Sequence, residues 1–184
     1  MKKWILTLLA VAIVGGGAFV YYTRSDSAEP LAVGADAPDF TTTGALAGEE
    51  FQFSLADKLK HGPVVLYFFP KAFTEGCTIE ANMFADVTSE FTAAGATVIG
   101  MSGDDIEGLK KFSVSECRDK FAVARADDSI IADYQVRMAP GLAMTNRTSY
   151  VIDRQGKIVF VHSATQPQGH VTGTLEKVKA LSEG

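Results

Sequence analysis

Hydrophobic and polar positions along the chain form two kinds of pattern, which predict alternating strands and helices. Val64–Phe69 and Ala96–Met101 are continuous apolar runs, rich in β-branched and aromatic residues and preceded by glycine or proline. Runs of this length and composition are typical of strands that are buried on both faces of a sheet. Phe121–Val123 predicts a third, shorter strand.

Apolar residues at helical spacing follow these runs. They recur every three or four positions after Cys77 and stop at Gly95, a residue type that commonly ends helices. Similar spacing predicts helices over Ile106–Lys120 and Val171–Leu181, and a short helix with a serine cap over Ser129–Tyr134.

Two further pairs of segments predict hairpins. Ala37–Phe40 and Phe51–Leu55 enclose a glycine-containing loop, while Ser149–Ile152 and Lys157–His162 flank the turn sequence Asp153–Gly156. Strands that alternate with helices, followed by a hairpin and a last helix, predict an α/β domain of three layers with a mixed central sheet. The thioredoxin-like fold has this order of elements.

The N-terminal segment has a different pattern. Lys2 and Lys3 precede the apolar run Trp4–Tyr22, which no charged residue interrupts. A basic start and an apolar run of this length are typical of a signal peptide or a membrane anchor. We therefore expect three parts: a signal anchor or signal peptide over 1–24, a tether over 25–32, and one thioredoxin-like domain over 33–184.

The flanking residues predict where the domain is located. Asp26-Ser27-Ala28 is a poor cleavage site because aspartate stands where a small residue is preferred, so the pattern favours an uncleaved anchor. The two lysines are expected to stay in the cytoplasm and the rest of the chain to face outward. In a bacterial cell this predicts a protein anchored in the inner membrane and facing the periplasm, or one exported to the periplasm.

Composition excludes several classes of function. A formal net charge of −5 offers no basic surface for nucleic acid. The two cysteines, Cys77 and Cys117, are too few for a disulfide-rich scaffold, and no residues have the paired spacing of zinc ligands. We therefore expect no metal, no cofactor and no nucleic-acid partner. Three scattered histidines are interpreted as surface or capping residues: His61, His162 and His170.

Cys77 lies where the first buried strand has ended and the next helix begins. A thiol reacts as its thiolate, which the unpaired N–H groups of a helix N-terminus or a nearby guanidinium stabilise. The position alone leaves a second interpretation open, because buried cysteines are commonly small packing residues.

The residues around this cysteine favour the reactive interpretation. Positions 70–77, PKAFTEGC, have the form P-x-x-x-T-x-x-C and follow a buried strand. With Ala-Pro-Asp-Phe at 37–40 and Arg-Thr-Ser at 147–149, the chain resembles the peroxiredoxins, most closely the bacterioferritin-comigratory or Q-type group. The resemblance covers almost all of Val33–Leu181. Glu75 departs from it, because this group often has proline at that position.

The resemblance implies a thioredoxin-like fold and a thiol-dependent peroxidase that reduces hydrogen peroxide and organic hydroperoxides. Cys77 would be the peroxidatic nucleophile, which the peroxide oxidises to a sulfenic acid. Thr74 would hydrogen-bond the thiolate and the peroxide, Arg147 would stabilise negative charge, and Pro70 would shield the pocket from water. Glu80 is expected to support the helix start or the loop rather than to act as a catalytic acid.

A second thiol must then resolve the sulfenic acid. In this group a resolving cysteine often lies five residues after the peroxidatic one, but Asn82 occupies that position here. Cys117 is the remaining candidate, and its disulfide with Cys77 would require local unwinding. Two alternatives stay open: an external thiol resolves Cys77 while Cys117 only packs, or the two cysteines form a permanent bridge.

Other functions of the same fold predict different chemistry. A thioredoxin-like thiol-disulfide oxidoreductase would need a cysteine in C-x-x-C spacing, which Cys77 lacks. A glutathione-peroxidase-like enzyme would need companion tryptophan and asparagine residues, and Trp4 is the only tryptophan. In a non-catalytic binding module, Cys77 would react no faster than an ordinary thiol. The expected partners of the peroxidase are a peroxide, a thioredoxin-like or other dithiol reductant, and the membrane; the chain itself is expected to be a monomer or a dimer.

Overall fold

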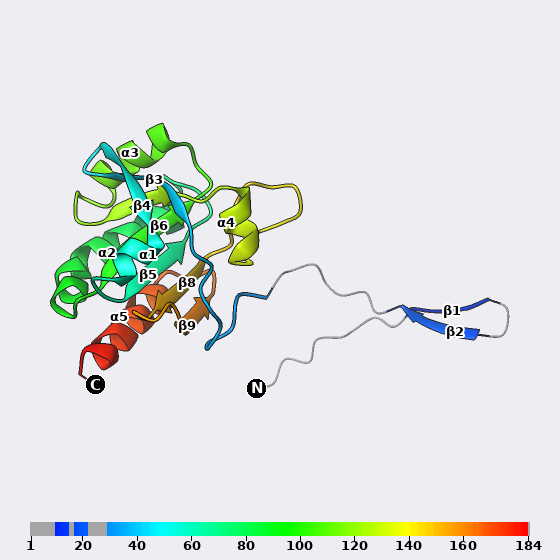
Figure 1. Ribbon diagram of the computed structural model, residues 1–184. Coiled ribbons are helices and arrows are strands. Elements are labelled where there is room, and N and C mark those ends of the chain that lie inside the picture. Colours follow the sequence, from blue (N-terminus) through cyan, green and yellow to red (C-terminus); the bar gives the residue numbers. More distant parts are fainter. Residues whose placement is uncertain (1–9, 15–16, 22–28, 184) are drawn as a thin grey trace.

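The computed structural model describes residues 10–14, 17–21 and 29–183. Its centre is a mixed sheet of seven strands in the order β4-β3-β7-β6-β5-β8-β9 (Figure 1). The strands β5 (Val64–Phe68), β6 (Thr97–Ser102) and β7 (Ala122–Arg125) are parallel, and the other neighbouring pairs in this sheet are antiparallel. The predicted α/β architecture with a mixed central sheet is confirmed.

Helices connect the parallel strands. α2 (Glu75–Ala93) joins β5 to β6, and α3 (Ile106–Ser115) leads towards β7. After these come the hairpin of β8 (Thr148–Ile152) and β9 (Ile158–Ser163) and the last helix, α5 (Gln168–Ser182). Each of these elements agrees with the hydrophobic pattern in type and order.

The first hairpin is correctly predicted as a hairpin, but its strands were placed wrongly. β3 (Thr41–Leu46) and β4 (Glu49–Ser54) pair residue for residue from Thr41 with Ser54 to Leu46 with Glu49. Ala37–Phe40, which was expected to be a strand, is instead a connection that the Tyr134 hydroxyl holds by donating to the Pro38 carbonyl at 2.8 Å. The sequence analysis also did not predict α1 (Leu55–Leu59).

The central strand β5 is buried on both faces, as its continuous apolar sequence predicts. Val65 and Tyr67 face the layer of α2, α3 and α5, whereas Val64, Leu66 and Phe68 face the opposite layer with α1 and α4. Alternate side chains of a strand point to opposite faces, so one apolar run supplies both cores. The two layers are visible on either side of the sheet in Figure 1.

Two helix boundaries differ from the predictions. α3 ends at Ser115 and not at Lys120, because Arg118 and Asp119 have φ angles of 52° and 58° that no α-helix accommodates. Cys117 therefore lies in the turn after α3. The short helix α4 (Asp128–Asp133) begins one residue earlier than predicted, and its cap is the Asp127 carboxylate, which accepts from the Ile130 N–H at 2.9 Å.

Only part of the predicted anchor is described. Ala10–Val14 (β1) and Gly17–Tyr21 (β2) pair as antiparallel strands, and no helix within the described residues is both long and apolar enough to cross a membrane. Residues 1–9, 15–16 and 22–24 of the predicted anchor, and 25–28 of the predicted tether, lie outside the described residues. The anchor and the domain boundaries stay predictions.

Candidate active site

Cys77 is the third residue of α2, and the loop between β5 and α2 sets its position. Two side chains from other loops hold this connection. The Thr145 hydroxyl donates to the Phe69 carbonyl at 2.8 Å, and the Ala72 N–H donates to the Asp104 carboxylate at 2.7 Å. The sequence analysis did not identify Thr145 or Asp104, because single polar residues far along the chain carry no spacing signal.

The loop reaches the helix through a residue with an uncommon backbone conformation. Phe73 has a φ angle of 62°, which costs free energy for a residue with a bulky side chain. Its ring packs edge-on against Phe112 of α3, with the ring centroids 5.3 Å apart, and Phe112 in turn stacks on Phe69. These contacts hold Phe73 in place, so the next residue, Thr74, can act as the N-cap of α2.

Arg147 lies beside the sulfur of Cys77. Its Nη2 is 3.5 Å from Cys77 Sγ, its Nη1 contacts Glu80 Oε2, and its Nε donates to the Thr165 carbonyl at 3.2 Å. The Arg147 side chain is 8% exposed and Cys77 is 1% exposed. A helix N-terminus and a buried guanidinium both favour a thiolate over a thiol. The two groups that the sequence analysis placed together therefore do meet.

Glu80 lies one turn further along α2 and is completely buried. Burial raises the pKa of its carboxyl to about 8, although the positive charge of Arg147 acts in the opposite direction. Its Oε2 contacts Arg147, whereas its Oε1 has no hydrogen-bond partner among the described residues. The expectation that Glu80 supports the site is consistent with these contacts.

His170 of α5 is also buried, so its interpretation as a surface or capping residue is wrong. Its Nε2 lies 2.9 Å from the Ala164 carbonyl and its Nδ1 lies 2.9 Å from Ser149 Oγ. Burial lowers the pKa of His170 to about 4, so the imidazole is neutral near pH 7. Its Nδ1 is 3.9 Å from Glu80 Oε1. Nothing in the local sequence around His170 or Ser149 pointed to this cluster.

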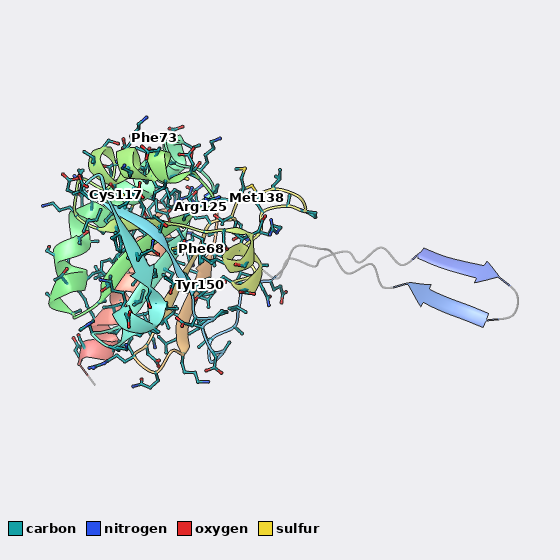
Figure 2. All side chains as sticks on the ribbon, turned by 45° about the horizontal axis from the view of Figure 1, so that its top comes forward. Phe68, Phe73, Cys117, Arg125, Met138 and Tyr150 are labelled. Carbon is teal, nitrogen blue, oxygen red and sulfur yellow. The ribbon has the colours of Figure 1, made fainter. Side chains whose placement is uncertain are left out.

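The two remaining predicted site residues lie at the edge of the site. Thr74 is exposed, and its hydroxyl donates to the Lys71 carbonyl at 2.9 Å, which is a contact different from the one expected with Cys77. Pro70 lines a surface hollow of about 260 Å³ together with Arg147 and Met138. Met138 lies on the loop after α4 and is 45% exposed (Figure 2).

Cys117 is completely buried in the turn after α3 (Figure 2). It belongs to the same core cluster as Cys77, on one face of the sheet. Both cysteines are free thiols, so the structure is that of the reduced chain. Burial, with a smaller contribution from the charges of Glu116 and Asp119, raises the pKa of the Cys117 thiol. Cys117 is therefore a protonated thiol until its surroundings change.

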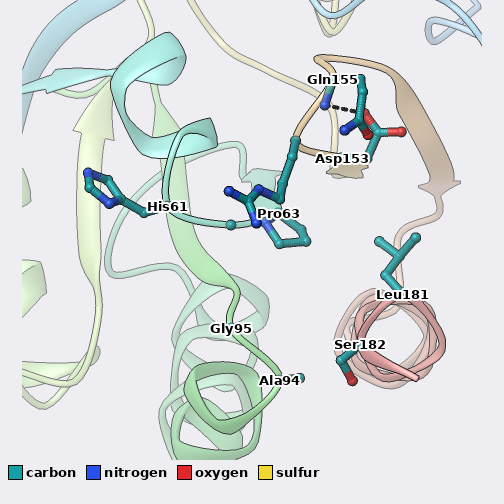
Figure 3. Close-up of a pocket in the computed structure, with 10 residues that line it drawn as sticks. His61, Pro63, Ala94, Gly95, Asp153, Gln155, Leu181 and Ser182 are labelled. Carbon is teal, nitrogen blue, oxygen red and sulfur yellow. Dashed lines mark hydrogen bonds between the residues drawn. The ribbon is translucent and has the colours of Figure 1, made fainter. Parts of the chain in front are cut away.

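A second surface pocket, of about 280 Å³, lies at the opposite end of the sheet (Figure 3). The start of β5 and the turn between β8 and β9 line it, whereas Cys77 follows the other end of β5. Within the turn, the Gln155 N–H donates to Asp153 Oδ1 at 3.0 Å, and Arg154 donates to the Lys60 carbonyl at 3.2 Å. In the part of the chain that the structure describes, no three His, Cys, Asp or Glu side chains are grouped to hold a metal ion. The cluster around Cys77 is thus the candidate active site.

Comparisons with known proteins agree with this assignment. Residues 33–161 match the AhpC/TSA family. Peroxiredoxin Q of Suaeda salsa is 35% identical over 125 residues, which are 67% of this chain and 58% of that protein. Peroxiredoxin Q of Sedum lineare is 31% identical over 149 residues, covering 80% of this chain and 78% of its own length.

A solved structure extends the similarity to the fold. The crystal structure of peroxidoxin BcpB from Mycobacterium tuberculosis has a TM-score of 0.73 and 31% identity, and the superposition covers 81% of this chain and 97% of that one. The predicted thioredoxin-like fold of the peroxiredoxins is confirmed. The chain therefore belongs to the AhpC/TSA family and is a peroxiredoxin, similar to the bacterioferritin-comigratory and Q-type members.

Proposed function

We propose that Cys77 is the peroxidatic cysteine of this thiol peroxidase and that Arg147 stabilises its thiolate. The contact of Arg147 Nη2 with Cys77 Sγ at the N-terminus of α2 carries the proposal. The sulfur attacks one oxygen of the peroxide and the O–O bond breaks. Cys77 is oxidised to sulfenic acid, and the other oxygen leaves as hydroxide or alkoxide and takes up a proton. Arg147 is close enough to stabilise that departing charge.

The other predicted residues have supporting roles in this proposal. Pro70 lines the hollow beside Arg147 and would exclude water from the reacting atoms. Thr74 would turn its hydroxyl away from the Lys71 carbonyl and towards the sulfur or the peroxide when substrate binds. Glu80 holds the guanidinium of Arg147 in place.

Peroxide consumption by the purified full-length chain, with a dithiol as reductant, tests this assignment. We expect Cys77→Ser to abolish consumption and Arg147→Met to lower kcat/KM by about 100-fold or more, the usual effect of removing a group that stabilises developing charge. Arg154→Met is the control, because Arg154 is exposed beside the pocket at the other end of the sheet. Peroxide consumption that survives Cys77→Ser would rule out the assignment.

The second half of the proposed cycle uses Cys117 as the resolving thiol. Its sulfur would attack the Cys77 sulfenic acid, so that an intramolecular disulfide and one water molecule form. A thioredoxin-like or other dithiol would then reduce the disulfide. Both cysteines lie in one buried cluster, which supports this route. The alternative is a one-cysteine cycle in which an external thiol resolves Cys77.

The proposed substrates are hydrogen peroxide and organic hydroperoxides. The hollow beside Arg147 has apolar walls at Pro70 and Met138, where an alkyl group can lie, and Arg147, which lines it, contacts the buried Cys77. We expect turnover of both kinds of peroxide by the same Cys77-dependent reaction.

The location of the enzyme is part of the same proposal. Lys2, Lys3 and the apolar run Trp4–Tyr22 would anchor the chain in the inner membrane with its catalytic domain in the periplasm, or direct its export there. The full-length chain should then sediment with bacterial membranes, resist extraction by salt and be digested by protease added to spheroplasts. Protection from the protease in intact spheroplasts, with digestion after lysis, would contradict the proposed orientation.

A further inference from the structure

A buried polar cluster lies behind Arg147, on the side away from solvent. It joins Glu80 of α2, Ser149 of β8 and His170 of α5, each of them completely buried. The chemistry of Cys77 as proposed above uses neither Ser149 nor His170. Burying a titratable group costs free energy of folding unless the group is paired. The presence of Glu80 and His170 beside an active-site arginine therefore requires a physical explanation.

The hydrogen bonds fix the proton positions on His170. The Ala164 carbonyl can only accept, so Nε2 carries the proton and donates to it. In the neutral ring Nδ1 is then an acceptor, and the Ser149 hydroxyl donates to it. Nδ1 lies 3.9 Å from Glu80 Oε1 and, as an acceptor, offers that oxygen no donor; no other described donor reaches it.

A negatively charged Glu80 would therefore have one oxygen without a donor. The acid form lowers this cost, because a neutral carboxyl group loses less free energy than a carboxylate when one of its oxygens is buried without a donor. Meanwhile Arg147 is the cation that contacts both Glu80 and Cys77. One guanidinium compensates one anion well in a site of low dielectric, and two anions poorly.

The geometry points to His170 and Ser149 as positioning residues of the active site, which keep a proton on Glu80 while Cys77 is a thiolate and let Glu80 become the counter-ion of Arg147 once Cys77 is oxidised. This inference rests on the proposed function, because it concerns the charge of the same Cys77. The neutral imidazole acts through Glu80 and Arg147 and does not touch the peroxide.

The charges and atoms of the first step then balance within the site. The Cys77 thiolate, the hydroperoxide and the Glu80 acid give the Cys77 sulfenic acid, the alcohol or water, and the Glu80 carboxylate. Two electrons pass from sulfur to the peroxide, the O–O bond breaks, and the proton given up at Glu80 matches the one taken up by the leaving oxygen. The negative charge beside Arg147 is thereby retained, having moved from Sγ to Glu80.

The surrounding elements present few other charges to this cluster. His162 of β9 packs edge-on against His170, with the ring centroids 4.6 Å apart, and lowers the pKa of His170 further. The Tyr67 hydroxyl of β5 is buried and has no hydrogen-bond partner in the described part of the chain, and burial raises its pKa well above its ordinary value. The titratable and charged groups that face Glu80 and His170 are Cys77, Arg147, His162 and Tyr67.

Infrared difference spectroscopy tests the proton on Glu80 directly. The full-length reduced protein is compared before and after one equivalent of hydrogen peroxide. We expect the C=O band of a protonated carboxyl group to be lost and carboxylate bands to appear, and expect both changes to be absent in Glu80→Gln. His170→Gln places an amide donor near Oε1 and should remove the acid band from the reduced protein, whereas His61→Gln, the same substitution at an exposed histidine, should leave it unchanged.

Ser149→Ala is the milder variant, because it keeps the imidazole and removes only the donor to Nδ1. The freed lone pair can then accept from the Glu80 acid, so we expect the acid band to persist and to move to lower frequency in a protein that unfolds at nearly the same temperature. An acid band that persists after oxidation of the wild-type protein, or that remains unchanged in both His170→Gln and Ser149→Ala, would overturn the inference.

A second measurement does not depend on peroxidase activity. At neutral pH a carboxylate at Glu80 would compete with the thiolate for Arg147, so alkylation of Cys77 by iodoacetamide should slow several-fold in His170→Gln. Adding Glu80→Gln in the double variant should restore the rate, which a merely structural defect would not permit. Additive losses in the double variant would contradict the inference even if Cys77 proves to be the peroxidatic cysteine. Conversely, if Cys77 is not the peroxidatic cysteine, the Cys77→Ser variant will still consume peroxide, whereas the alkylation rates of the His170 and Glu80 variants do not depend on that result.

Discussion

At the scale of single residues, the active site depends on how closely Arg147 is enclosed. Its guanidinium contacts Cys77, Glu80 and the Thr165 carbonyl, and the first turn of α2 lies directly against it. A planar group with five donors can contact all three partners at once, which a lysine ammonium cannot do in the same geometry. Small changes in the surface that encloses Arg147 should therefore alter catalysis without unfolding the protein.

Gly76→Ala tests this enclosure. A Cβ at position 76 would lie 3.0 Å from Arg147 Nη2, so the guanidinium must move by a few tenths of an ångström. Alanine favours a helix over glycine by up to about 1 kcal/mol, so we expect the free energy of unfolding to stay constant or to rise. The value of kcat/KM for hydrogen peroxide should fall about tenfold. Steady-state kinetics and urea unfolding measure the two effects separately.

Gly108→Ala is the matched control for this prediction. Gly108 also lies in the first turn of a helix, but its added Cβ would lie 3.4 Å from the Asp105 carboxylate, an ordinary contact remote from Cys77. This variant should keep wild-type kinetics. Equal kinetics for both variants would show that Arg147 has room to move.

The sequence indicated that Cys77, Arg147 and the supporting Glu80 belong to one site, but it did not indicate the buried residues behind them. Cys77 and Arg147 stand in a motif and before a hairpin, so their pairing followed from the resemblance. Ser149 was seen only as part of the Arg-Thr-Ser motif and the start of a strand, and His170 only as a scattered histidine, so neither was linked to Glu80. They meet Glu80 only because α5 packs on β8 beside α2, and that juxtaposition depends on the complete fold.

At the scale of elements, the turn after α3 controls access to Cys117. Arg118 Nη2 donates to Asp86 Oδ1 at 2.6 Å and to the Asn82 carbonyl at 2.8 Å, and Asn82 Nδ2 lies 3.3 Å from Glu116 Oε2. These bonds fasten the turn to α2, on the residues that follow Cys77. We expect these bonds to open when Cys117 approaches Cys77.

Cys117→Ser separates the two proposed routes of resolution. With Cys117 as the resolving thiol, this variant should consume one equivalent of peroxide at the normal rate and then stop. Intact-mass measurement should show Cys77 with one or more added oxygen atoms, where the wild-type chain loses two hydrogens as the disulfide forms. Continued cycling of the variant with the same dithiol would instead support resolution by an external thiol.

Arg118→Ala should make resolution faster. The ion pair with Asp86 is largely exposed, with side chains 42% and 65% exposed, so its contribution is at most about 1 kcal/mol and the expected gain in rate is about two- to fivefold. The rate of disulfide formation after a single equivalent of peroxide, followed by quenching and mass measurement, gives the value. Lys110→Ala removes exposed ion pairs of α3 that do not involve α2 and serves as the control. A slower rate in Arg118→Ala would mean that the turn assists the attack instead of restraining it.

The sequence predicted elements well where local chemistry ends them. α2 stops before Gly95, which has a φ angle of 76°, and the second hairpin turns at Gly156, with 78°. It failed for the end of α3, because Cys117 continues the apolar pattern of the helix although the backbone turns into the left-handed region at Arg118. An apolar residue at helical spacing indicates that its side chain is buried. It does not show whether the backbone at that residue is a helix or a turn.

At the scale of the whole molecule, the buried cluster links folding to pH. Unfolding returns Glu80 to its ordinary pKa of 4.5, whereas its folded pKa is about 8, so between these values unfolding releases a proton and stability falls as pH rises. His170 acts in the opposite sense. Its folded pKa is about 4 against an ordinary 6.5, so unfolding takes up a proton in that window and stability falls as pH falls. The two slopes oppose each other below pH 6.5, and only that of Glu80 remains above it.

We therefore expect the reduced wild-type chain to lose about 1 kcal/mol of its free energy of unfolding between pH 6.5 and pH 8, since the slope of up to about 1.4 kcal/mol per pH unit declines as folded Glu80 ionises near pH 8 and is partly offset by His170 near pH 6.5. Urea unfolding at a series of pH values, with a reductant that keeps both thiols free, measures the slope. Glu80→Gln cannot release the proton, so its stability should change less over the same range, and the difference between the two curves isolates Glu80 from every other titrating group. Parallel curves would mean that Glu80 is already a carboxylate at pH 6.5 in the folded protein, and both the pH dependence of stability and the proton held beside Arg147 would then have to be abandoned together.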